Sequence, residues 1–84
     1  MDEIDFKILA AINTVSPRRF VSPVRVNEVL QLNETELGNR LMLMKRSGHL
    51  DIMTSEYASS LTLPNAISRV CLTELGQESL KEKH

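Results

Sequence analysis

The chain of 84 residues is long enough for one domain, and its 42% hydrophobic and 25% charged residues exclude a disordered tail. Its formal net charge of −1 argues against a protein that holds nucleic acid by overall positive charge alone. No apolar run approaches the roughly 20 residues that a membrane span requires, so we expect no membrane partner.

A first helix is predicted over residues 3–13. Asp2 is a suitable N-cap, and the acidic residues that follow it favour the positive end of the helix dipole. Ser16 and Pro17 end the helical pattern, and a brief edge strand at Phe20–Val21 is expected in the connection PRRFVSP. The apolar stripe of this helix consists of Ile4, Ile8, Ala11, Ile12 and Val15.

Two further helices follow with only residues 31–33 between them. The second helix begins at Ser22–Pro23, since serine is a good N-cap and proline fits the first helical position. The third runs from Asn33 to about Ser47, and the pair Asn33 and Glu36 predicts a variant of the capping box. Gly48 follows, where a positive φ is expected. The apolar residues are Val26, Val29 and Leu30 in the second helix and Leu37, Leu41 and Met44 in the third.

After Gly48 the hydrophobic period changes from helical to alternating. Leu50 and Ile52 are expected on one face of a strand, and a second β-branched run, ISRVCLT, predicts its partner. The two strands form a β-hairpin, in which Cys71 is expected to be buried as a small hydrophobe. Thr73 then caps a last helix, TELGQESLKEK.

The order helix, helix, helix, strand, strand, helix predicts a single α+β domain over residues 1–84. A short helix, a three-residue turn and a longer capped helix is the pattern of a helix-turn-helix, whose second helix enters the major groove of DNA. Residues 17–70 carry seven Arg or Lys against five acidic residues, a net charge of +2. The positive charge is therefore concentrated in the segment that would face DNA.

Two segments resemble a known superfamily. LNETELGNRLMLMKRSGHLDI resembles the recognition helix and first wing strand of winged-helix regulators, with apolar residues eleven, seven and four positions before Gly48. VCLTELGQESL resembles the junction of wing and last helix in MarR-like and PadR-like proteins, through Leu72, Thr73, Gly76 and Leu80. The resemblance implies a winged helix-turn-helix with three helices, a β-hairpin wing at about 50–72 and a C-terminal helix. It also implies a DNA-binding transcriptional regulator.

By this resemblance, the recognition helix at about 34–46 lies in the major groove. Arg40 would pair with a guanine edge and Asn39 with adenine, beside Thr35 and Glu36. Because one small helix-turn-helix reads few base pairs, a homodimer is expected. Contacts with the DNA backbone are expected from Lys45, Arg46, Arg18, Arg19, Arg25 and Arg69.

Several features favour a different class, a winged-helix protein–protein adaptor that does not bind DNA. Glu34 and Glu36 begin the third helix, where they either cap it or repel phosphate, and the loop EYASSLTLPNA lacks basic residues. Leu43 is expected to complete the core, whereas for Met42 a core and a surface position are equally expected. A partner interface in this alternative would consist of Met42, Leu43, Leu61 and Leu63.

The sequence contains no signature of an enzyme. No glycine-rich phosphate loop, no metal-ligand spacing and no nucleophile beside a base is present, so no catalytic residue, metal or cofactor is predicted. The single cysteine cannot form an internal disulfide, and the acidic start MDEIDFKI does not fit a signal peptide. Both features predict a cytoplasmic protein.

Overall fold

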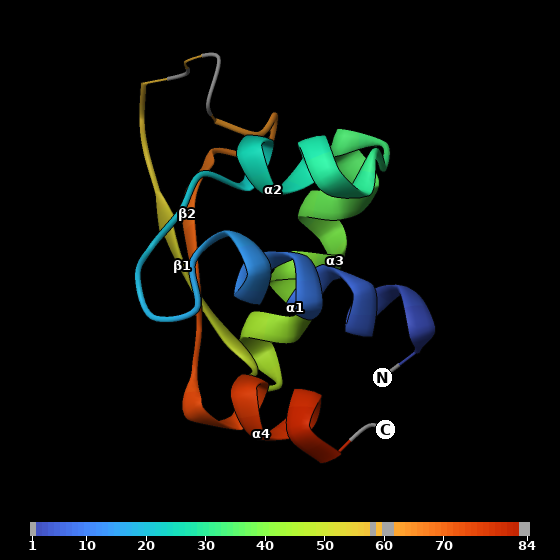
Figure 1. Ribbon diagram of the computed structural model, residues 1–84. Coiled ribbons are helices and arrows are strands. Elements are labelled where there is room, and N and C mark those ends of the chain that lie inside the picture. Colours follow the sequence, from blue (N-terminus) through green and yellow to red (C-terminus); the bar gives the residue numbers. More distant parts are fainter. Residues whose placement is uncertain (1, 58, 60–61, 83–84) are drawn as a thin grey trace.

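The computed structural model describes residues 2–57, 59 and 62–82. Along this part of the chain, α1 (Glu3–Val15), α2 (Pro23–Leu30) and α3 (Glu34–Arg46) precede β1 (Leu50–Thr54), β2 (Ile67–Leu72) and α4 (Glu74–Glu82). The hairpin stands along one side of the helices, with α1 crossing in front of α3 (Figure 1). The α+β class and the order of elements predicted from the sequence are confirmed. None of the described helices is long and apolar enough to cross a membrane.

The helix caps form as the sequence predicts. Asp2 Oδ1 accepts a hydrogen bond from the Asp5 amide at 3.0 Å, and Asn33 Oδ1 accepts from Thr35 and Glu36 at 2.9 and 3.2 Å. Ser22 and Thr73 cap α2 and α4 in the same way, and Gly48 adopts a φ of +86°. The side chain of Glu36 accepts from Arg40, so only one half of the expected capping box is formed.

The core lies between α1, α3 and the inner face of the hairpin. Three expectations about it are wrong. Val29 of α2 is 62% exposed and Val15 is 39% exposed, whereas Leu9, absent from the predicted stripe, is fully buried. Apolar spacing defines which residues share a helix face but not where the neighbouring elements end. Buried residues from all three regions include Ile8, Leu9, Ile12, Leu37, Leu41, Leu50, Ile67 and Val70.

The hairpin presents two different faces. Leu50 pairs with Leu72 on the inner face, while Asp51 pairs with Cys71 on the outer face. Val21 forms an isolated antiparallel bridge with Val70, with both amides donating at 2.9 Å, so the expected edge strand is one residue long. The outer positions are Asp51, Met53, Arg69 and Cys71.

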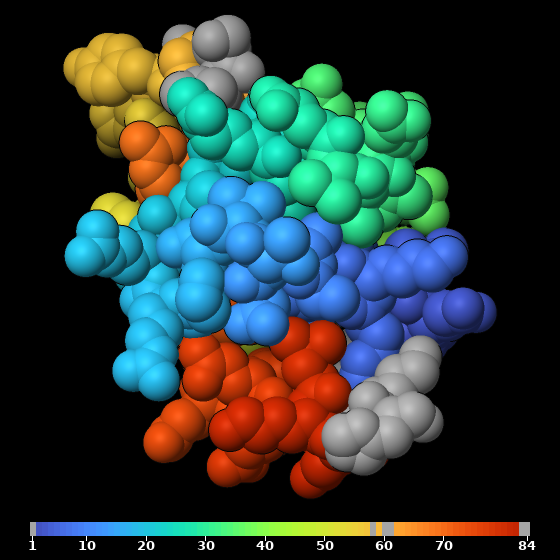
Figure 2. Space-filling view, in the orientation of Figure 1, coloured from blue at the N-terminus to red at the C-terminus, as the bar shows by residue number. Residues whose placement is uncertain are grey.

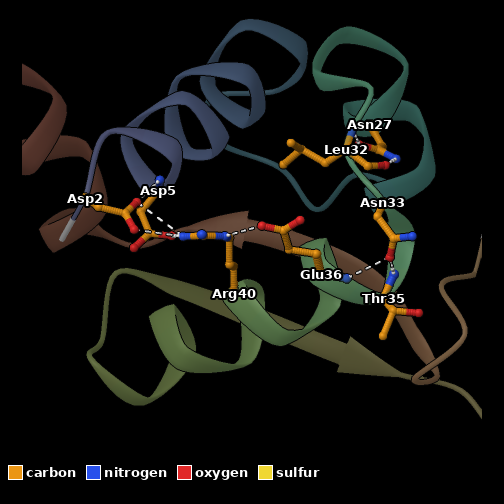
Figure 3. A network of polar contacts seen from close by, with 8 residues as sticks. All are labelled: Asp2, Asp5, Asn27, Leu32, Asn33, Thr35, Glu36 and Arg40. Carbon is orange, nitrogen blue, oxygen red and sulfur yellow. Dashed lines mark hydrogen bonds and ion pairs between the residues drawn. The ribbon is translucent and has the colours of Figure 1, made fainter.

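The turn between α2 and α3 depends on Asn27. Its Nδ2 donates to the carbonyl of Leu32 at 2.8 Å, and its Oδ1 accepts from the Leu32 amide at 2.9 Å (Figure 3). Gln31 closes α2 in the left-handed region, at a φ of 59°. The three-residue linker is therefore confirmed, but the side chain that shapes it was not anticipated.

We expect Asn27→Ala to lower the free energy of unfolding by about 1–2 kcal/mol, because a half-buried amide and carbonyl lose their partner. Asn27→Asp keeps the acceptor and loses the donor, so it should cost less. Urea denaturation monitored by circular dichroism measures both variants. A change within about 0.5 kcal/mol, as for an ordinary surface substitution, would show that the turn forms without Asn27.

The start of α4 packs directly on the backbone that enters β1. Thr73 Oγ1 donates to the carbonyl of Gly48 at 2.5 Å, and the Thr73 amide donates to that of His49 at 3.2 Å. Gly76 lies so close that a Cβ at this position would overlap the His49 carbonyl oxygen. The Thr-x-x-Gly spacing of this junction therefore has a steric basis.

Candidate nucleic-acid interface

One face of α3 is left uncovered by the described residues. Leu37, Gly38, Leu41 and Met44 are buried against the rest of the fold. Since successive residues of a helix turn by about 100°, Asn39 lies near the middle of the opposite face. Thr35 is also on this face and Glu36 is exposed beside it, so of the four residues predicted to face DNA bases only Arg40 is half-buried. The exposed face consists of Thr35, Asn39, Met42, Leu43 and Arg46.

Arg40 lies at the edge of this face, and three carboxylates hold its guanidinium (Figure 3). Nη1 donates to Asp2 Oδ2 at 3.0 Å and to Asp5 Oδ1 at 3.2 Å, and Nε donates to Glu36 Oε1 at 3.3 Å. The Arg40 side chain is only 23% exposed. The guanidinium of Arg40, which was predicted to contact a base, therefore pairs with Asp2 and Asp5 and with Glu36, another residue predicted to contact a base.

The pKa values of Arg40 and Asp2 are shifted so that both side chains are held in their charged forms. Hydrogen bonds to Asp2 and Asp5 raise the pKa of the Arg40 guanidinium further above its ordinary value. The pKa of Asp2 is lowered from 3.8, first by the Asp5 amide and then by Arg40. Because the pKa of Asp2 is lower in the folded state, ionised Asp2 stabilises the fold at pH values above about 3.8. This stabilisation is lost as the pH falls through the lowered pKa.

The predicted phosphate-binding residues do not all lie beside α3. Arg18 lines a hollow of about 360 Å³ with Lys81 of α4, on the side of the molecule formed by α1, its connection to α2 and α4. Figure 2 shows the molecule from the side on which α1 and α2 hide most of α3. Arg18 is therefore placed at the junction with α4 and not at the exposed face of α3. The other predicted cations are exposed: Arg19, Arg25, Lys45, Arg46 and Arg69.

Charge changes sign along α3. Its first turn carries Glu34 and Glu36, and its last turn carries Lys45 and Arg46. Glu34 also lines a hollow of about 220 Å³ with Glu56 of the hairpin loop, and the described lining contains no basic residue. Phosphate would be repelled at this end of α3, so a nucleic acid would find favourable charge at the other end.

The apolar residues predicted to form a partner interface separate in the structure. Leu43 is 62% exposed, so the expectation that it completes the core is wrong, and Met42 is 37% exposed beside it. Leu63 is 2% exposed and belongs to the core, which removes it from any surface. Leu61 lies outside the described residues. Surface apolar contact on α3 therefore comes from Met42 and Leu43.

Cys71 is half-buried on the outer face of the hairpin, and not fully buried as expected. Burial and, to a smaller extent, the facing Asp51 raise the pKa of its thiol above 9.0.

Because the thiolate is the reactive form, we expect Cys71 at pH 7.5 to react with a thiol reagent more slowly than free cysteine. Stopped-flow labelling against pH measures this, and Asp51→Asn should accelerate it. A faster reaction than that of free cysteine would contradict the raised pKa.

Comparisons of the chain with protein-family models, with curated proteins and with solved structures gave no match. The class of protein is therefore inferred from the arrangement of the described residues.

Proposed function

We propose that the chain is a winged helix-turn-helix protein that binds duplex DNA as a transcriptional regulator, acting as a homodimer. In this proposal α2 and α3, joined by the turn that Asn27 shapes, form the helix-turn-helix, and the β1–β2 hairpin is the wing. The carrying observation is the uncovered face of α3, where Thr35, Asn39 and Arg46 are exposed on a helix whose opposite face is buried. A helix presented in this way is what major-groove recognition requires.

The exposed side chains of α3 have complementary roles in this proposal. The Asn39 amide has the donor and acceptor that pair with adenine N7 and N6, and the Thr35 hydroxyl can serve either as donor or as acceptor. Leu43 is exposed one turn after Asn39 and supplies an apolar contact for a thymine methyl group. Lys45 and Arg46 bind phosphates at the basic end of the helix.

The proposal predicts salt-dependent binding to duplex DNA. Exposed basic residues on α2, α3, β2 and the α1–α2 connection contribute about three to five phosphate contacts per protomer, so the slope of log K against log salt should be about −3 to −4.5 for each protomer. Fluorescence anisotropy of the purified protein with a random duplex, measured across a salt series, tests this. Absence of binding at low salt would contradict DNA binding by this chain.

A second function is favoured by one observation. Leu43 and Met42 form an apolar surface towards the end of α3, and the first turn of the same helix is acidic. This surface fits a protein–protein adaptor of the same fold, which would present α3 to another protein. If the salt series shows no DNA binding, the adaptor becomes the leading proposal, and Leu43→Ser is the variant that should abolish capture of its partner.

A further inference from the structure

The N-terminus of α1 and the middle of α3 are joined by a charge network between residues far apart in the sequence. Arg40 is 38 residues from Asp2 and 35 from Asp5, and Nη1 reaches both carboxylates. The same guanidinium lies beside the face of α3 to which the proposed function assigns DNA contact. The positive charge of Arg40, at the edge of that face, is thus paired with carboxylates of the chain itself.

We propose that Asp2 and Asp5 form an autoinhibitory contact that withholds Arg40 from the phosphates of DNA. This inference rests on the proposed function of α3. Carboxylate and phosphate oxygens both fit the planar donors of a guanidinium, so the two anions compete for the same N–H groups. Bidentate binding of phosphate by Nη1 and Nη2 therefore requires that the bonds from Nη1 to Asp2 and Asp5 break.

The exposure of the partners allows this exchange. The side chains of Asp2 and Glu36 are 59% and 49% exposed, while that of Asp5 is 20% exposed. Ion pairs in contact with water are weak and are screened by salt, whereas DNA presents a dense row of phosphates. The contact is thus strong enough to orient Arg40 in the free protein and weak enough for a polyanion to displace it.

Release requires no movement of a helix. Arg40 lies at the border between the α1 terminus and the exposed face of α3, and rotation about its side-chain bonds redirects the guanidinium. The contact therefore lowers the affinity for DNA of any sequence, because a phosphate contact is withheld and not a base contact.

The test compares the wild-type protein with the double variant Asp2→Asn, Asp5→Asn. Asparagine is as good an N-cap as aspartate, so α1 should keep its start. One additional phosphate contact steepens the salt slope by about one and raises the affinity for a random duplex by about five- to tenfold at 0.1 M salt. The single variant Asp5→Asn, which leaves the cap untouched, should show part of this gain. Circular dichroism confirms that each variant is folded.

Two controls separate release of Arg40 from simple loss of negative charge. Glu3→Gln combined with Glu28→Gln removes the same charge from residues outside the network, and should leave the salt slope unchanged. Arg40→Ala in the Asp2→Asn, Asp5→Asn background should abolish the gain. If the gain persists without Arg40, or if both charge-matched variants gain equally, the autoinhibitory contact is refuted.

The outcomes for the inference and for the proposed function are distinct. Wild-type binding with an Arg40-dependent gain supports both, and wild-type binding without a gain refutes only the contact. If the wild type does not bind at low salt, DNA binding by the wild-type chain is refuted, and an Arg40-dependent gain in the double variant supports only the contact. If neither protein binds at low salt, both DNA binding and the contact are refuted.

Discussion

Gly76→Ala is expected to lower the free energy of unfolding by about 2–3 kcal/mol, and the midpoint of thermal unfolding by about 10–20 °C. A Cβ at position 76 would overlap the carbonyl oxygen of His49, which is a backbone atom at the entry to β1. Relief requires α4 to move away, and with it the contact between Thr73 and Gly48. Because a small domain is stable by only about 5–15 kcal/mol, this is a large loss.

Gly38→Ala is the matched control, since it also places a methyl group at a buried helical glycine. The group nearest to its Cβ is the side chain of Asn65, which is exposed and can rotate away. Alanine also favours the helix by about 1 kcal/mol over glycine, so the net change should lie within about 1 kcal/mol. Differential scanning calorimetry of both variants decides: equal losses would show that overlap with a backbone atom is not what makes position 76 sensitive.

Asn39→Ala is expected to reduce the affinity for a preferred duplex by about ten- to a hundredfold, with much less effect on a random duplex. Asn39 is near the centre of the uncovered face of α3, so in the proposed complex its amide is the group that reads a base. The preferred duplex is obtained by selecting wild-type protein against a randomised library. Equal losses on both duplexes would contradict a base-reading role for Asn39.

Arg46→Ala and Lys81→Ala provide the comparison between the two sides of the molecule. Each removes one cation from the last turn of a helix, α3 and α4 respectively. Arg46→Ala should weaken binding to both duplexes and reduce the salt slope by about one, whereas Lys81→Ala should change neither. Anisotropy titrations at several salt concentrations give the slopes. The reverse order of effects would move the DNA-binding surface to the hollow that Arg18 and Lys81 line.

Local signals in the sequence were sufficient for the elements and for most of their ends, although α1 continues to Val15, two residues past its predicted end. The caps at Asp2, Ser22, Asn33 and Thr73 and the positive φ of Gly48 depend on neighbours within three residues, and all are confirmed. The change from helical to alternating periodicity after Gly48 likewise predicts both strands, because side chains on one strand alternate between two faces. These features need no knowledge of the rest of the fold.

The candidate site was only partly accessible from sequence. Spacing on α3 predicts that Thr35 and Asn39 avoid the core, and both are exposed. The same spacing cannot show that the start of α1 reaches Arg40, because Asp2 and Asp5 precede Arg40 by 38 and 35 positions in the sequence. For this reason the sequence predicts a base contact for Arg40, whereas in the structure the charge of Arg40 is paired with Asp2 and Asp5.

The sequence by itself determined the six elements, their order and the burial of Leu37, Leu41 and Met44 in α3, because caps, turns and periodicity act over a few residues. Only the tertiary structure decided that Leu43 is exposed and Leu63 buried, that Arg18 lies beside α4, and that Arg40 is held by Asp2 and Asp5. Exposure and charge pairing depend on which distant segments pack together. That packing arises from the burial of the whole core, which no local pattern specifies.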